Sequence, residues 1–188
     1  MTKTKQNSVL EFFKQNLVLC GIVVLIIVTA IAEPKFLGAA NLNNVLRQLG
    51  PLPFAALGMT FVIIAGFIDL SIVGIISLVG VITVGLIDPL GQGGALLVGI
   101  LLGAFLGWLN GLVLTTCGAM TQAEVLFITY GMSSIYMALA LIYTQSETLR
   151  LAKSEKSYSI FTTLGSKNLG IIPVVLILFI VILVLMHL

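Results

Sequence analysis

Charged residues divide this chain into long apolar stretches. Asp, Glu, Lys and Arg are absent from six of them: residues 15–32, 48–68, 70–87, 89–123, 125–146 and 168–188. An α-helix rises about 1.5 Å per residue, so each stretch is long enough, or nearly so, to cross roughly 30 Å of hydrocarbon. The pattern predicts an all-α fold, a polytopic transmembrane helix bundle of about six spans within residues 16–188. The expected spans are Asn16–Ala32, Pro51–Phe67, Leu70–Ile87, Gly94–Thr116, Val125–Tyr143 and Ile171–Leu188.

The composition indicates a membrane protein. Hydrophobic residues make up 59% of the chain and charged residues 9%, whereas about 25% of the residues in soluble domains are charged. Water cannot solvate such a surface, so the lipid bilayer is the expected environment. The net charge of +2 is spread thinly, without a basic block or stripe, and this excludes a nucleic-acid-binding protein.

Two connections between the expected spans are long. In the first, residues 33–50, Asn41 is expected to cap a short interfacial or partly inserted helix, because apolar residues three and four apart follow it. The second, Thr144–Gly170, carries most of the remaining charges together with several Ser and Thr. It is expected to be a polar external loop that could contact a soluble partner.

Basic residues near the first span set the expected orientation. Lys3, Lys5 and Lys14 precede that span, and Lys and Arg near helix ends favour the cytoplasmic side. Residues 1–15 are therefore expected to form a cytoplasmic N-terminal segment. The charge count opposes this orientation, since the loops it places outside hold six basic residues against three inside. The assignment is kept because the first helix often dominates.

Glycine recurs every four residues in the fourth expected span, at Gly99, Gly103, Gly107 and Gly111. Such Gly-xxx-Gly units let another helix approach closely within lipid. We expect these glycines to be helix-packing positions in a central span, and packing without chemistry is the favoured interpretation. Asn110 lies beside this ladder, where a buried amide more often bonds a neighbouring backbone group than a substrate.

Asp69 is the only charged residue between Arg47 and Asp88. An ionised side chain inside hydrocarbon is costly, so Asp69 marks either a functional point or a membrane edge. The sequence has no Ser-His-Asp set, metal-ligand spacing or phosphate-binding loop. The positions of Cys20 and Cys117, in and between apolar stretches, are more typical of buried thiols than of a disulfide. We expect no catalytic residue, metal or cofactor. An intramembrane enzyme is disfavoured because Asp69 has no ionisable partner visible in the sequence.

A series of short motifs occurs in a fixed order along the chain. Leu57–Ile64 (LGMTFVII) followed by Ile68–Ser71 (IDLS) resembles a signature of the permease subunits of bacterial ATP-binding cassette importers for ribose, xylose and related monosaccharides. Further matching motifs are Asn41–Gln48, Asn110–Leu112, Phe127–Met132, Ala140–Thr144, Leu164–Gly165 and Gly170–Pro173. Each motif is weak alone, but the collinear run across roughly residues 36–188 is specific.

The chain also departs from this family pattern. Phe67 stands where the family has one of two paired glycines, and Ile72–Gly74 carries an extra residue, which in a helix rotates all later side chains by about 100°. Glu124 stands where the family has a proline or a small residue. Permeases of the family are also much longer, so the resemblance covers only their N-terminal half.

The resemblance implies a permease subunit that moves a monosaccharide inward across the bacterial cytoplasmic (inner) membrane. The implied partners are an ATP-binding cassette ATPase subunit, an external sugar-binding protein that could dock on the loop 144–170, and a second permease subunit in a homo- or heterodimer. Asp69, Ser71, Asn110 and Thr129 are expected to line or brace the substrate pathway. The alternative is a degenerate or fragmentary permease without independent transport, and no sugar uptake is expected from this chain with its partners alone.

Overall fold

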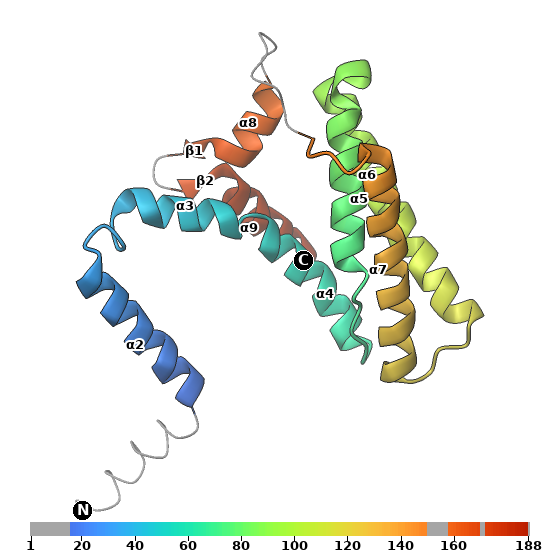
Figure 1. The fold of residues 1–188 in the computed structure, drawn as a ribbon, viewed down its shortest axis with the longest axis horizontal. Coiled ribbons are helices and arrows are strands. Elements are labelled where there is room, and N and C mark those ends of the chain that lie inside the picture. The colour runs from blue at the N-terminus through green and yellow to red at the C-terminus, as the bar shows by residue number, and fades with distance from the viewer. Residues whose placement is uncertain (1–15, 150–157, 170–171, 188) are drawn as a thin grey trace, which may run out of the picture. The chain divides into compact units, whose positions relative to one another are not determined.

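A computed structural model of the chain describes residues 16–149, 158–169 and 172–187 (Figure 1). The expected cytoplasmic segment 1–15 lies outside the described residues. The chain divides into two units, Met1–Arg47 and Gln48–Leu188, and each is described by itself.

The first unit contains α2 (Leu17–Ala32) and most of α3 (Ala39–Leu49). None of the residues of α2 is buried. The predicted cap at Asn41 is wrong, because the helix begins two residues earlier, at Ala39. The Asn41 side-chain amide instead donates to the carbonyl of Phe36, 2.7 Å away, and so ties the helix to the turn that precedes it.

The second unit begins with α4 (Pro51–Ile64), whose two prolines lie in its first turn. Proline is tolerated there because the first amides of a helix have no partner within it. The expected short helix is present as α3, which ends before Gly50, while its place at the membrane interface stays a prediction. Taken together, Ala39–Ile64 form an apolar helical segment of 26 residues.

Three helices form the packed core: α5 (Ile72–Gly85), α6 (Ile87–Thr116) and α7 (Gln122–Thr144). They run alongside one another, and α5 packs against both of the others (Figure 1). The core cluster consists of Leu78, Leu106, Tyr136 and Ala140.

Close backbone approach explains how tightly α5 meets α7. A Cβ atom at Gly74 would lie 2.7 Å from the Cα atom of Ser133, which is too near for any side chain. Glycine at this position therefore sets the separation of the two helices.

The C-terminal part is more structured than expected. The predicted polar loop 144–170 contains α8 (Ser159–Ser166) and β1 (Asn168–Leu169), while residues 150–157 of that loop lie outside the described part. β1 pairs antiparallel with β2 (Ile172–Pro173), and α9 (Val174–His187) follows. Phe179 of α9 meets Phe54 of α4 edge-on, with ring centroids 5.7 Å apart.

The helices confirm an all-α bundle of membrane helices. Three helical segments are long and apolar enough to cross a bilayer: Ala39–Ile64, Ile87–Thr116 and Gln122–Thr144. Three shorter apolar helices accompany them: Leu17–Ala32, Ile72–Gly85 and Val174–Met186. The predicted fourth span, Gly94–Thr116, corresponds to the part of α6 that follows Gly91. The backbone of Gly91 is not helical (φ 70°, ψ 170°) and separates this part from a first turn that begins at Ile87.

Candidate functional site

The chain leaves helical geometry between α4 and α5, around the motif IDLS. Two hydrogen bonds end α4, from the Gly66 amide to the Ile63 carbonyl (2.9 Å) and from the Phe67 amide to the Val62 carbonyl (3.1 Å). Together with the positive φ of Gly66, 88°, they form a Schellman motif, which requires a residue that tolerates left-handed backbone. Gly66 therefore determines where the helix stops.

Side chains from the break itself and from α7 accept hydrogen bonds from two of the backbone amides between the two helices. The Ser71 amide donates to the Asp69 carboxylate over 2.7 Å, just before α5 begins. The Leu70 amide donates to the hydroxyl of Thr129 on α7 over 3.1 Å. Thr129 in turn donates to the carbonyl of Val125 over 2.8 Å. Unpaired backbone groups are costly inside a membrane, so these bonds permit a break there.

A chain of three buried polar side chains connects the start of α5 to α6 and α7. The Tyr136 hydroxyl donates to the Asn110 side-chain oxygen over 2.7 Å. The Asn110 side-chain nitrogen donates to the hydroxyl of Ser71. All three side chains are at most 3% exposed, so water does not compete for these bonds.

A further bond extends this arrangement along α7. The Ser133 hydroxyl accepts from the Gly74 amide over 3.2 Å, in the first turn of α5, whose amides have no partner within the helix. Thr129 and Ser133 of α7 thus bond the start of α5 directly, while Tyr136 reaches it through Asn110 of α6. We call these residues, Asp69, Ser71, Asn110, Thr129, Ser133 and Tyr136, the polar brace.

The structure brings all four predicted pathway residues into the polar brace. Ser71 and Thr129 are fully buried and Asp69 is half-buried. Each of the four bonds backbone or another member of the brace, so the geometry describes bracing of the break. A role of these residues in lining a substrate path stays a prediction.

Ser133 and Tyr136 were missed by sequence reasoning. On α7 they follow Thr129 at intervals of four and three residues, and Ala140 continues this spacing on the same buried side. A search for small and hydroxyl-bearing residues at helical spacing could have found them.

The glycine ladder on α6 divides into two halves. A side chain at Gly99 would clash with Thr83 of α5, and a Cβ atom at Gly103 would lie 3.8 Å from Val79. No described atom would come within 4 Å of a Cβ at Gly107 or Gly111. The packing role expected for the second half therefore stays a prediction.

No group of three or more His, Cys, Asp or Glu among the described residues could hold a metal ion. The chemistry that the polar brace offers is hydrogen bonding by hydroxyl, amide and carboxylate groups. Such groups hold backbone or bind uncharged polar molecules, and they do not suggest a reaction.

Comparison with known proteins places the chain in a family. A family model described as "Branched-chain amino acid transport system / permease component" matches residues 41–188. The chain belongs to this permease family. The match includes the whole polar brace. No solved structure matches the chain.

Relatives in this permease family are named for sugars. The chain is 32% identical over 133 residues to the ribose import permease protein RbsC of Bacillus subtilis (strain 168), covering 69% of this chain and 39% of that protein. It is 24% identical over 175 residues to the RbsC of Haemophilus influenzae, covering 92% and 52%. The xylose transport system permease protein XylH of Escherichia coli is 36% identical over 93 residues, 46% of this chain and 24% of XylH. The chain thus spans about half the length of these relatives, or less.

Proposed function

We propose that this chain is part of the permease of an ATP-binding cassette importer that moves a monosaccharide inward. The observation that carries the proposal is the match to two ribose import permeases, which covers 69% and 92% of this chain. The family description names branched-chain amino acids instead. We favour a sugar because relatives aligned individually are named for ribose, xylose and galactose.

The break between α4 and α5 suggests how the chain would serve transport. Non-helical backbone at membrane depth is tolerated where protein buries it or where it lines a cavity, and in transporters such breaks lie near substrate sites. The polar brace would hold one side of the break fixed against α6 and α7. On this proposal the four predicted residues hold the helices beside the pathway in place and do not mainly contact the substrate. These residues are Asp69, Ser71, Asn110 and Thr129.

Energy and substrate delivery would come from other proteins. We propose an ATPase subunit on the cytoplasmic side, an external sugar-binding protein and a second permease subunit, in the bacterial cytoplasmic (inner) membrane. Residues 144–170 would face outward on the orientation predicted from Lys3, Lys5 and Lys14.

A second candidate is a fragmentary permease that does not transport by itself. The supporting observation is the covered length, 39% and 52% of the two ribose permeases. On this candidate the remaining helices must be supplied for any transport to occur.

Uptake in membrane vesicles tests both candidates. The chain would be assembled with the ATPase and binding protein of its own organism, with and without a polypeptide that supplies the remaining permease helices. We expect ATP-dependent uptake of labelled ribose, xylose or galactose only when those helices are present. Uptake of leucine but of no sugar would overturn the sugar assignment, and sugar uptake by the chain without the added helices would overturn the fragment candidate.

A further inference from the structure

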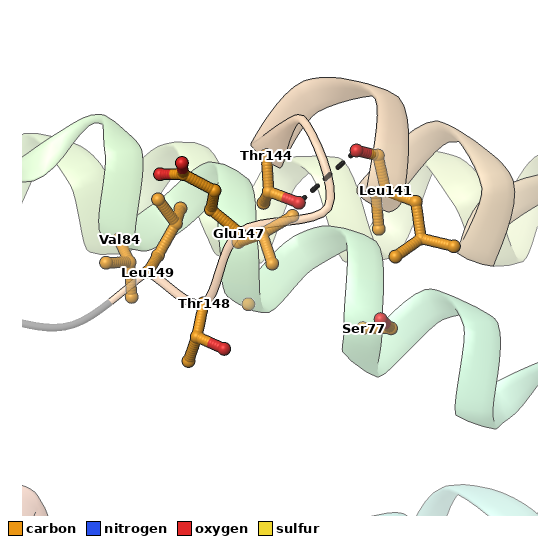
Figure 2. Close-up of a pocket in the computed structure, with 10 residues that line it drawn as sticks. Ser77, Val84, Leu141, Thr144, Glu147, Thr148 and Leu149 are labelled. Carbon is orange, nitrogen blue, oxygen red and sulfur yellow. Dashed lines mark hydrogen bonds between the residues drawn. The ribbon is translucent and has the colours of Figure 1, made fainter.

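A groove of about 430 Å³ opens between α5 and the C-terminal end of α7. Figure 2 shows Glu147, Thr148 and Leu149, from the segment after α7, beside Val84 of α5. Its size falls within the range of small-molecule sites, roughly 300–1,000 Å³. The groove is distinct from the polar brace, none of whose residues lines it.

An unusual turn builds this groove. Gln145 and Ser146 have φ values of 53° and 63°, and they are the two non-glycine residues with positive φ in the described chain. The Ser146 amide donates to the Leu141 carbonyl over 2.9 Å, and the Glu147 amide donates to the Thr144 carbonyl over 2.9 Å. Left-handed backbone is unfavourable for residues other than glycine, and such strain clusters at functional positions. The turn directs the chain from the end of α7 back to the groove.

The lining combines apolar and polar side chains. Val84 and Leu141 are apolar, while Glu147, Thr148 and Ser77 supply a carboxylate and two hydroxyls. The Thr144 hydroxyl also lies in the groove but already donates to the Leu141 carbonyl (Figure 2). Few polar groups placed on an apolar wall are typical of small-molecule sites.

The charges of the lining discriminate between ligand classes. Its ten residues include one carboxylate and no Lys or Arg. The carboxylate of an amino acid would find no cation among these residues and would be repelled by Glu147. A sugar ring carries no charge, has hydroxyls that can donate to a carboxylate, and has a C–H face that can lie on an apolar wall.

We propose that this groove is a monosaccharide-binding station at one end of the transport path. Glu147 accepts hydrogen bonds from ring hydroxyls, and Val84 and Leu141 lie against the C–H face of the ring. On the predicted orientation this end of α7 faces outward, where the sugar would enter. The choice of a monosaccharide as the ligand of this groove rests on the proposed function.

Protection of an introduced cysteine tests the groove directly. In a C20A/C117A background, T148C would place a thiol at an exposed position beside Glu147. The complete transporter in membrane vesicles would be labelled with a membrane-impermeant maleimide, with ribose, xylose, galactose or leucine added. We expect at least one of these sugars to slow labelling about fivefold or more, and leucine to leave the rate unchanged.

A matched pair of variants tests whether the Glu147 carboxylate binds the protecting sugar. E147Q should raise the sugar concentration that gives half-protection about tenfold, because a charge-assisted hydrogen bond becomes a neutral one. E124Q removes the same charge from the opposite end of α7, and glutamine preserves the capping box there. E124Q should therefore leave protection unchanged. Equal labelling of all variants without sugar shows that the fold is intact.

The outcomes separate this proposal from the proposed function. Two results, each together with sugar uptake, would overturn the proposed sugar site in the groove without contradicting the importer. One is that no transported sugar slows the labelling, and the other is that E147Q and its parent need the same sugar concentration for half-protection. Protection by sugar without any uptake supports the groove and counts against the importer. Protection by leucine alone overturns the groove as a sugar site.

Discussion

α2 and α5 are both short apolar helices, of 16 and 14 residues, yet they differ in what their faces meet. In α5, Gly74, Leu78 and Thr83 are buried, and polar groups of the neighbouring helices reach its first turn. Within its own unit no residue of α2 is buried, and no described atom would come within 4 Å of a Cβ at Gly21. Apolar side chains gain little by leaving lipid for protein, so small residues and interhelical hydrogen bonds decide which helices pack.

The largest effect should come from filling the closest approach in the packed region. G74L should lower the free energy of unfolding by about 3 kcal/mol, because its side chain would overlap the backbone of Ser133. The same change in α2, G21L, should cause no loss. Unfolding in mixed micelles with increasing SDS measures both. If G74L and G21L lower the free energy of unfolding equally, the closely packed α5 and the exposed α2 do not differ in packing as described.

Breaking the polar brace should have the next largest effect. N110L keeps most of the side-chain volume but leaves the hydroxyls of Tyr136 and Ser71 without their buried partner. We expect a loss of about 2 kcal/mol in the free energy of unfolding. The control N44L changes an exposed asparagine of α3 and should shift that energy by less than about 0.5 kcal/mol. A loss below that limit for N110L would contradict the brace.

The end of α4 should give the smallest effect. G66A places a side chain at a φ of 88° and should cost about 1 kcal/mol in the free energy of unfolding. G58A lies in the same helix, in open space and without positive φ, and should be neutral or slightly stabilising. The same SDS titration compares them. If G66A is as stable as G58A, the Schellman motif does not determine where α4 ends.

Hydropathy alone identifies most of the fold because crossing a bilayer demands long uncharged helices. The positions of α5, α7 and α9 differ from the predicted spans by a few residues. The larger differences have local causes. Gly91 has non-helical backbone and separates a first turn from the rest of α6. α8 with its short strand pair forms where the polar composition of 144–170 suggested only a loop.

The candidate site could be predicted only in part. The lone charge of Asp69, followed by Ser71, marks the place where the apolar helices are interrupted, and this is visible in the sequence. Asn110 is visible as a polar residue inside the apolar helix α6. Which groups they bond depends on how the helices turn toward one another. Tyr136 and Ser133 share a helical spacing with Thr129 and Ala140, which marks one side of α7, but the groups that they bond follow only from the packing.

The bonds from α7 limit how this chain could change shape. Rotating or sliding the first turn of α5 against α7 would break the bonds of Thr129 to Leu70 and of Ser133 to Gly74 together. The start of α5 and this part of α7 would therefore move as one body. The backbone around Gly66, where φ is 88°, is the place at which α4 could change its direction relative to them.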